Sequence, residues 1–443
     1  MARIAFLGAG STVFAKNVLG DCILTPEIPD LSIALHDIDP ARLDDSKRMI
    51  ETIARNAGRK VPVTATLDRR AALQGADFVV NAIQVGGYEP CTVTDFEVPK
   101  KYGLRQTIAD TLGIGGIFRT LRTLPVMEEF ARDVAEICPD ALFINYSNPM
   151  AMLTGYLQRF TPVKAVGLCH SVQVCASGLL HTFRMDEHIP DCRWTIAGIN
   201  HQAWLLEIRD RDGKDLYPEI KRRAAAYREG REEYEGRWDL VRHEMMRRFG
   251  YYITESSEHT SEYVPYFIKS RYPELIERFS IPLDEYPRRC VNQIAEWKRV
   301  RAELVEGRSA HLLVHEMSHE FAASIVRAMA TDVPYRVHGN VLNAGLIANL
   351  PSNACVEVPC LVDRNGIQPC VVGDLPEQCA ALNRTSINVQ LLTLEAATKR
   401  KKELVYMAAM LDPHTAAELS IDDIVALCDD LFAAHGSWIP KYE

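Results

Sequence analysis

The chain has 443 residues, of which 47% are hydrophobic and 25% are charged, and its formal net charge is −9. These are ordinary values for a globular protein, and they exclude a largely disordered chain. The negative charge gives no electrostatic reason to bind nucleic acid or an anionic membrane, so we expect neither partner. Because the chain has no long apolar run and no signal-peptide pattern at its start, we expect a cytoplasmic protein without a membrane span.

Strand and helix patterns alternate along the first part of the chain. Short apolar runs predict strands at residues 3–7, 31–36, 61–66, 77–83, 141–145 and 163–168. Helices are expected between them, at residues 11–24, 41–57, 120–136 and after Pro149. Such alternation is typical of a parallel sheet with helical crossovers, so we predict a Rossmann-like dinucleotide-binding domain over residues 1–190.

Beyond about residue 190 the pattern changes. We expect paired strands, charged helices, β segments around the turn Asn365-Gly366 and one last long helix, at residues 194–209, 218–249, 289–304, 320–329, 356–362, 371–373 and 388–411. This predicts a mixed α+β substrate and metal domain over residues 191–443. No linker separates the halves, and together they indicate an α/β fold of the lactate and malate dehydrogenase type.

A glycine turn lies between the first predicted strand and the first helix. Gly8 and Gly10 let the backbone approach a pyrophosphate, and Ser11 stands at the start of the helix, whose amino terminus stabilises negative charge. The third glycine of G-x-G-x-x-G is replaced by Val13, so a plain tight turn is the alternative.

Asp37 ends the second predicted strand. A carboxylate there accepts hydrogen bonds from ribose hydroxyls and repels a 2′-phosphate, which favours NAD over NADP. The alternative is that Asp37 or Asp39 caps the helix that begins near Pro40.

Cys169 and His201 are the candidate metal ligands. Cys169 follows a predicted strand at its carboxyl end, where parallel sheets bind ligands, and His201 ends the string G-I-N-H. A thiolate and an imidazole suit a borderline divalent ion and leave its shell open for substrate. The alternative is a buried thiol and a hydrogen-bonded core histidine.

Two further segments carry titratable groups. Residues 251–266 contain Glu255, Tyr263 and Tyr266 among several possible proton carriers, and a solvated loop is the alternative. Residues 315–319 match H-E-x-x-H, the zinc-protease motif. Because no third ligand follows at a suitable spacing, we interpret them as polar groups at a helix entry that at most border the pocket.

Long strings of the chain resemble glycoside hydrolase family 4, and most of all its melibiase-type α-galactosidases. The strings are G-A-G-S-T-V-F from Gly8, G-G-Y-E-P-C-T-V-T-D-F-E-V from Gly86, Q-T-I-A-D-T-L-G-I-G-G from Gln106, Y-S-N-P-M-A-M from Tyr146, C-H-S-V-Q from Cys169, G-I-N-H from Gly198, T-E-S-S-E-H from Thr254 and D-P-H-T-A-A from Asp412. C-H-S-V resembles the form found in the α-galactosidases of the family.

The resemblance implies hydrolysis of terminal α-D-galactosides with NAD and Mn²⁺ or a similar divalent metal. In this chemistry, which the family uses in place of two carboxylates, NAD oxidises the sugar at C3 and a base removes the C2 proton. The aglycone then leaves by elimination, water adds and the ketone is reduced. A homodimer or homotetramer is also implied.

The resemblance also assigns residues. It implies metal binding by Cys169 and His201 and substrate binding by Asn148. His170 stands where phosphoglycoside-specific members have an aspartate acid, and an imidazolium can also donate a proton. Asp110 is expected to accept a sugar hydroxyl, with a helix or turn cap as the alternative.

Tyr263 stands near the position of the family's tyrosine base, although Tyr266 or Glu255 remain alternatives. A phenol needs a nearby cation to ionise near neutral pH. The competing functions are an α-glucosidase or α-galacturonidase of the same family, an NAD-dependent hydroxy-acid dehydrogenase and a dinucleotide-sensing regulator without activity.

Overall fold

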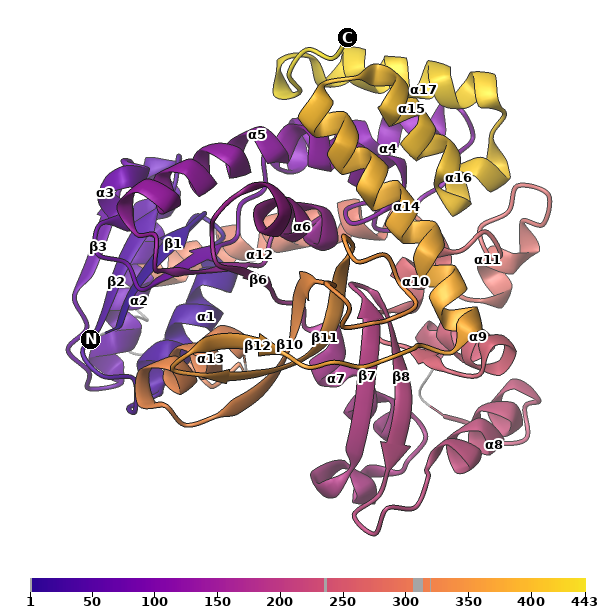
Figure 1. The fold of residues 1–443 in the computed structure, drawn as a ribbon, viewed down its shortest axis with the longest axis horizontal. Helices are drawn as coiled ribbons and strands as arrows, with labels where there is room; N and C mark the ends of the chain where they lie inside the picture. The colour runs from indigo at the N-terminus through magenta and orange to yellow at the C-terminus, as the bar shows by residue number, and fades with distance from the viewer. Residues whose placement is uncertain (1, 235–236, 306–313, 319) are drawn as a thin grey trace.

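A single mixed sheet runs through the whole molecule (Figure 1). The computed structural model describes residues 2–234, 237–305, 314–318 and 320–443. Within these residues, twelve strands form the sheet in the order β3-β2-β1-β4-β5-β6-β10-β11-β7-β8-β9, and β12 pairs with β11.

The first half of the sheet is parallel throughout. Its strands are β1 (Ala2–Leu7), β2 (Leu31–His36), β3 (Val63–Thr66), β4 (Phe78–Asn81), β5 (Leu142–Asn145) and β6 (Ala165–Gly167). The order β3-β2-β1-β4-β5-β6 is that of a dinucleotide-binding Rossmann sheet. The central strands β4 and β5 are buried at every position, as expected for strands that are covered on both faces.

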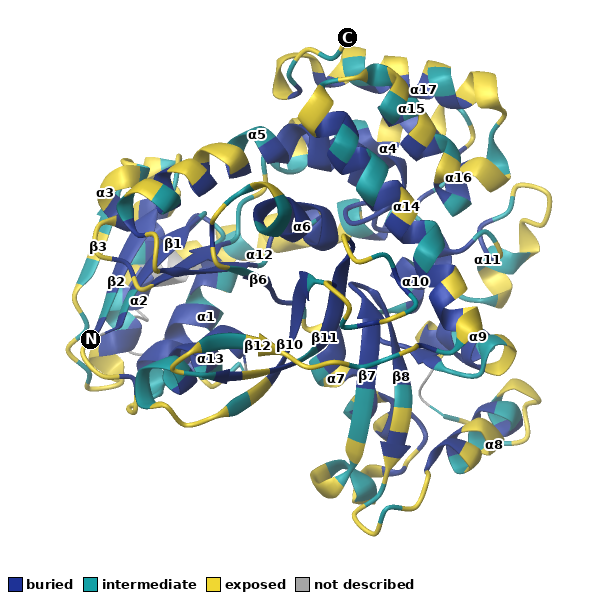
Figure 2. Cartoon of the chain, in the orientation of Figure 1, coloured by how far each residue is buried: buried dark blue, intermediate teal, exposed yellow. Residues whose placement is uncertain are grey.

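Helices cover both faces of the parallel half, with their buried sides toward the sheet (Figure 2). One face carries α1 (Thr12–Leu24), α2 (Pro40–Asn56) and α13 (Phe321–Thr331). The other carries α3 (Arg69–Leu73), α5 (Gly113–Ile137) and α6 (Met150–Phe160).

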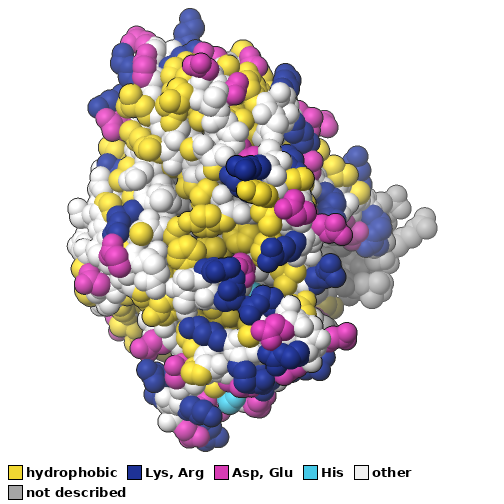
Figure 3. Space-filling model, turned by 90° about the vertical axis from the view of Figure 1, so that its right-hand side faces the viewer, with side chains coloured by type: hydrophobic (Ala, Val, Ile, Leu, Met, Phe, Trp, Pro, Cys, Tyr) yellow, Lys and Arg dark blue, Asp and Glu magenta, His cyan; other side chains and the backbone are white. Residues whose placement is uncertain are grey.

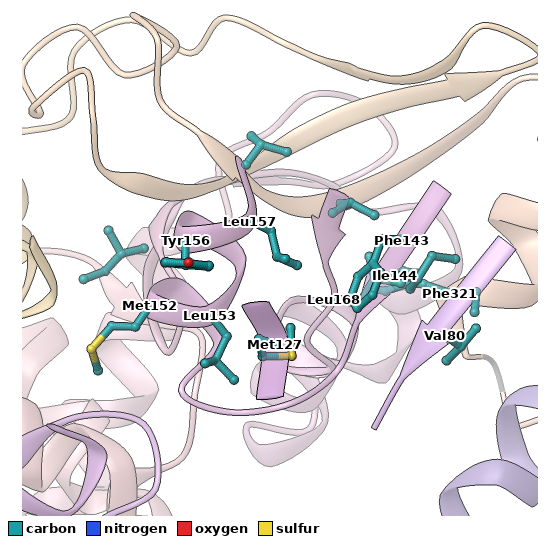
Figure 4. Close-up of a cluster of buried hydrophobic side chains, with 14 of the residues drawn as sticks. Val80, Met127, Phe143, Ile144, Met152, Leu153, Tyr156, Leu157, Leu168 and Phe321 are labelled. Carbon is teal, nitrogen blue, oxygen red and sulfur yellow. The ribbon is translucent and has the colours of Figure 1, made fainter. Parts of the chain in front are cut away.

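The core of this half forms where α5 and α6 meet the central strands. Figure 4 shows Met127 and Leu153 from the two helices near Phe143 and Ile144 of β5. All four side chains are fully buried. Burial of side chains of this size stabilises the fold by about 2 kcal/mol each, which fixes the strands that carry the candidate site at their ends.

The second half of the sheet is antiparallel. Its strands are β7 (Arg193–Ile199), β8 (Gln202–Arg209), β9 (Tyr252–Ile253), β10 (Tyr335–Leu342), β11 (Cys355–Asp363) and β12 (Gly366–Pro369). Strand β10, which the sequence analysis did not predict, joins the halves by pairing with β6. The described chain has no helix long and apolar enough to cross a membrane.

The remaining helical elements mostly lie around the antiparallel half and along the top of the molecule in Figure 1, whereas α12 (Glu285–Val305) contacts α2 of the parallel half. They are η1 (Gly87–Thr92), α4 (Val93–Lys100), α7 (Ser171–Thr182), η2 (Asp186–Asp191), α8 (Tyr217–Arg228), η3 (Arg237–Asp239), α9 (Leu240–Phe249), α10 (Ser257–Tyr263), α11 (Glu274–Arg278), α12 (Glu285–Val305), α14 (Glu377–Lys399), α15 (Lys402–Leu411), α16 (Pro413–Glu418), α17 (Ile421–His435) and η5 (Gly436–Trp438).

Three predicted elements of the second half are wrong in extent. The helix expected at 388–411 is two helices, because Arg400 adopts a left-handed φ of 54° and ends α14. It is also not the last helix, since α17 follows. The stretch 218–249 is likewise divided into α8 and α9. The turn is Arg364-Asn365 instead of Asn365-Gly366, and because this two-residue turn pairs β12 with β11 at once, the β segment expected at 371–373 lies at Gly366–Pro369.

The described part of the predicted helix entry, residues 315–318, is held by a buried carboxylate. Residues 314–318 contain no helix, and His319 lies outside the described residues. Asp21, inside α1 and fully buried, accepts hydrogen bonds from His315 Nε2 at 2.7 Å and from the amides of Ser318 and Glu320 at 2.8 and 2.9 Å. His315 Nε2 is bonded to Asp21, and residues 314–318 form no helix. These residues therefore do not form the metal-binding helix of a zinc protease.

Replacing Asp21 by Ala should lower the free energy of unfolding by about 3 kcal/mol, because it leaves two backbone amides and a buried imidazole without their acceptor. Urea denaturation followed by circular dichroism measures the loss. Asp44→Ala is the matched control, since Asp44 forms only an exposed ion pair with Arg48 and should cost less than about 0.5 kcal/mol. Equal losses in the two variants would contradict the role of Asp21.

Candidate functional site

The candidate residues gather at the edge of the sheet where the parallel strands end. Gly8 follows β1, Asp37 follows β2, Asn148 follows β5 and Cys169 follows β6. The carboxyl ends of parallel strands meet at one edge, which is where open α/β sheets bind their ligands. The local folding of the Rossmann half therefore brings both the dinucleotide turn and the candidate metal cysteine to one side of the molecule.

Cys169, His201 and Glu255 form the one metal-ligating cluster found among the described residues. Their candidate ligand atoms all lie within 4.8 Å of one another. His201 stands at the tip of the tight β7–β8 hairpin with a left-handed φ of 62°, and Glu255 follows β9 just before α10. Three segments that are distant in sequence thus supply a thiol, an imidazole and a carboxylate.

The electrostatics of this cluster suit a cation. Burial raises the pKa of the Cys169 thiol. Burial alone would also raise the pKa of Glu255, but His259, His201 and the Ser256 amide lower it to about 2, so its carboxylate is ionised. A positive ion between the three groups would favour both the thiolate and the carboxylate.

Unsatisfied polar atoms beside the cluster also fit a ligand. The Nδ1 atom of His201 and both polar atoms of the Asn200 side chain are buried and have no hydrogen-bond partner. Buried groups of this kind are costly unless something pairs with them. The donor set of one sulfur, one nitrogen and one carboxylate oxygen fits a borderline divalent metal with open positions for substrate oxygens.

Asp110 and Asn148 lie together at one side of the cluster. Asn148 Nδ2 donates to Asp110 Oδ2 at 3.2 Å, and the carboxylate also lies 4.0 Å from an Arg119 nitrogen and 3.9 Å from His259 Nε2. The residue before helix α5 is Leu112, so Asp110 does not cap that helix. Its carboxylate is buried among polar side chains, and Oδ1 also accepts a hydrogen bond from the Thr111 hydroxyl at 2.8 Å.

The loop that carries Asp110 is fixed by a buried glutamate. Both oxygens of Glu262 accept hydrogen bonds from the successive amides of Thr107, Ile108 and Ala109. Burial raises the pKa of Glu262 to about 7, although these amides act in the opposite direction. Glu262 belongs to the segment 251–266, which the sequence predicts to contain proton carriers. Its hydrogen bonds indicate that it anchors the Asp110 loop.

The three candidate bases have different surroundings. Tyr263 is buried, donates to the Asn200 carbonyl at 3.4 Å, and has its ring centroid 6.5 Å from that of His201. Burial, together with the charge of Asp110, raises its pKa. Tyr266 is 48% exposed and stacks on Phe249. The segment is mostly buried, so the solvated-loop alternative is wrong.

His170 lies next to the cluster at the first turn of α7. Its side chain is about half exposed, and Nε2 is 2.7 Å from Oε1 of Glu320, which is itself buried. The hydrogen bond to Glu320 raises the pKa of His170. Glu320 is held in turn by the Asp21 contact described above. This segment therefore reaches the candidate site through Glu320, whereas His315 is bonded to Asp21.

The glycine turn has the close contacts expected of a dinucleotide site. Gly8 has a φ of 87°, and a Cβ atom there would lie 2.7 Å from the Ala82 carbonyl oxygen. Asp37 Oδ2 accepts from the Gly10 amide at 2.6 Å, whereas Asp39 caps α2, so the capping role belongs to Asp39 alone. The Ser11 hydroxyl is buried without a partner.

Several residues of the site were missed by sequence reasoning. Glu255 was considered only as a base, and its place beside Cys169 depends on β9 pairing with β8. Arg119 and Glu320 had no local signal, because one lies inside a helix and the other in a segment tied to α1. The acid-rich string T-E-S-S-E-H was the one usable signal for Glu255.

The chain belongs to family 4 of the glycosyl hydrolases. The model "Family 4 glycosyl hydrolase" matches residues 3–185, and "Family 4 glycosyl hydrolase C-terminal domain" matches residues 196–415. An α-galactosidase of Bacillus subtilis (strain 168) is 58% identical over 443 residues, with all of both chains covered. An α-galactosidase of Rhizobium meliloti (strain 1021) is 34% identical, over 99% of this chain and 89% of its own.

A solved structure has the same fold. The 6-phospho-α-glucosidase from gut microorganisms, crystallised in complex with NAD and Mn²⁺, superposes with a TM-score of 0.83 at 22% identity and covers 100% of both chains. The predicted fold class, a Rossmann-like parallel sheet with a mixed C-terminal half, is confirmed.

Replacing Glu255 by Ala should weaken Mn²⁺ binding by at least about 10-fold, because one of three clustered ligands is lost. Titration of free Mn²⁺ by electron paramagnetic resonance measures the affinity without any substrate. Glu258→Ala is the matched control, since Glu258 lies on α10 but pairs with Arg289 instead of the cluster. Unchanged affinity in Glu255→Ala would exclude Glu255 as a ligand.

Proposed function

We propose that this protein is an α-galactosidase that hydrolyses terminal α-D-galactosides such as melibiose, using NAD and Mn²⁺ or a similar divalent metal. The observation that carries the proposal is the meeting of a thiol, imidazole and carboxylate cluster with a dinucleotide turn at one sheet edge. The 58% identity to an α-galactosidase and the string C-H-S-V support galactosides over glucosides or galacturonides.

The residues that would hold the cofactors are those that converge at this edge. Gly8, Gly10, Ser11 and Asp37 would hold NAD, and Cys169, His201 and Glu255 would hold the metal. When bound, NAD supplies a hydride acceptor for C3 of the sugar, and the metal stabilises negative charge on the sugar oxygens. The related 6-phospho-α-glucosidase was crystallised with both groups.

Tyr263 is our choice for the base that removes the C2 proton. Of the three alternatives, Tyr266 stacks at the surface and Glu255 faces the other metal ligands, whereas Tyr263 is buried beside the turn that carries His201. Burial raises the pKa of Tyr263, and a cation in the cluster would favour its phenolate. Asn148 and Asp110 would position the sugar hydroxyls through their amide and carboxylate.

His170 is our choice for the acid that protonates the leaving aglycone. Its position next to Cys169 places it beside the sugar-binding edge, and its half-exposed side chain can meet an aglycone that extends toward solvent. Glu320 accepts the Nε2 hydrogen and so fixes the orientation of the ring.

Other assignments belong to the same proposal. Residues 1–190 would form the dinucleotide-binding part, and residues 191–443 would supply most of the substrate and metal contacts. All twelve cysteines are free thiols, which supports a reducing, cytoplasmic location. We also expect a homodimer or homotetramer, as the family resemblance implies.

The proposed function predicts release of nitrophenol from p-nitrophenyl α-galactoside when the protein is supplied with NAD, Mn²⁺ and a thiol reductant. A chelator should abolish the reaction, and C2-deuterated substrate should react more slowly because a C–H bond at C2 is broken. Absorbance at 400 nm follows the rate at about 1 mM substrate.

Matched assays separate the alternatives. Cys169→Ala should lose hydrolysis but still bind NAD, measured by fluorescence titration. Rates on the corresponding α-glucoside and α-galacturonide test the substrate class. Stoichiometric formation of NADH without nitrophenol release would instead support a hydroxy-acid dehydrogenase, and NAD binding without any turnover would support a regulator.

Replacing His170 by Asn should lower the rate on melibiose by about 10²-fold and the rate on p-nitrophenyl α-galactoside much less, because nitrophenolate leaves without protonation. Glu320→Gln should also lower the rate on melibiose more than the rate on p-nitrophenyl α-galactoside. The kcat for each substrate measures the effect. Glu316→Gln serves as the control, since Glu316 is exposed in the same segment. Equal losses on both substrates would exclude His170 as the acid.

A further inference from the structure

A basic cavity lies apart from the candidate metal site, on the side of the molecule that carries α8, α9 and α11. Its volume is about 570 Å³, within the range of sites for small molecules. Figure 3 looks at this side of the molecule and shows Lys and Arg side chains gathered beside a hydrophobic area. The cationic residues of its lining are Lys221, Arg228, Arg237, Arg247 and Arg278.

The charge of this cavity is opposite to that of the chain. Five of its lining side chains are cationic and one, Glu244, is anionic, whereas the whole chain has a formal charge of −9. Glu244 is already paired with Arg247 and with Arg248 outside the cavity. The cavity therefore concentrates positive charge where the rest of the protein repels anions.

Three of the cations have no carboxylate partner among the described residues. Lys221 lies over the ring of Tyr217 at 4.8 Å, Arg278 lies over the ring of Phe279 at 5.2 Å, and Arg237 donates to the Ser280 hydroxyl at 3.3 Å. These contacts leave most of their N–H groups free to bind an anion. A guanidinium presents its N–H groups in the fork that phosphate and carboxylate oxygens fit.

A buried imidazole adds a further polar group to the lining. His243 is 7% exposed, and its Nδ1 has no hydrogen-bond partner, while Nε2 lies 3.2 Å from Asp239 Oδ2. The apolar side chains of Leu240, Met246 and Phe279 line the cavity together with these polar groups. A matching ligand therefore combines negative charge with an apolar body.

We propose that this cavity binds a small organic anion, one that joins a doubly charged phosphate or similar group to an apolar body. A cavity of about 570 Å³ with both cationic and apolar lining fits such a molecule better than it fits a long polyanion. The proposal does not depend on the proposed function, because none of its residues belongs to the candidate active site.

Calorimetric titration of the full-length protein with 1-naphthyl phosphate tests this proposal. NAD is kept saturating, so that the dinucleotide turn cannot take up the probe. We expect a Kd of about 100 μM or tighter and one site per chain, and no comparable binding of neutral 1-naphthol. The double variant Arg237→Gln/Arg278→Gln should weaken binding by at least about 10-fold.

A second double variant, Arg211→Gln/Arg222→Gln, removes the same charge outside the cavity and should keep the parental Kd. An unchanged melting temperature in both double variants shows that each is folded. Equal weakening in the two double variants would show that general surface charge, and not the cavity, attracts the probe. Binding of 1-naphthol with equal affinity would show that apolar burial alone holds the probe. Either result would overturn the proposal. If Arg237→Gln/Arg278→Gln changes the oligomer size in gel filtration, a second copy of the chain occupies the cavity, and the proposal is overturned.

Discussion

One row of four residues across the sheet connects the two candidate metal ligands. Gly167 pairs with Asn340, Asn340 with Glu357, and Glu357 with Gly198. Gly167 lies two residues before Cys169, and Gly198 lies three before His201. The Asn340 side chain strengthens the row by donating to the Gly167 carbonyl and to Glu357, both at 3.3 Å. The separation between the backbones of Cys169 and His201 is thus set by pairing between strands.

Much of the parallel half follows from local sequence. Alternating apolar runs and helices, with Gly8 and Asp37 at the ends of two strands, are enough to predict a Rossmann-like sheet and the edge at which Cys169 lies. These features are local, because each crossover joins neighbouring segments of the chain. The resemblance of long motifs then added the residue roles that spacing alone left open.

The second half was less predictable because its defining contacts are long-range. Strand β10 enters the sheet between β11, which follows it in the chain, and β6, which lies far from it in the sequence, and hydrophobic periodicity does not predict the pairing with β6. The same holds for His315, which meets Asp21 across 294 positions. The H-E-x-x-H string is an example. It would indicate a zinc site only on a helix, and the described part of the segment is instead held by Asp21 of α1 without forming a helix.

The conformation of His201 limits what evolution and mutagenesis can place there. Apart from glycine, the residues that most readily adopt a left-handed φ are Asn, Asp and His, whose short polar side chains tolerate that region. Those three are also able to bind a divalent cation. A change at the hairpin tip that preserves the turn therefore tends to preserve some affinity for metal, whereas alanine adds backbone strain to the loss of a ligand. The donor atom at this position can therefore change between nitrogen and oxygen, and the preferred metal with it, while the hairpin stays intact.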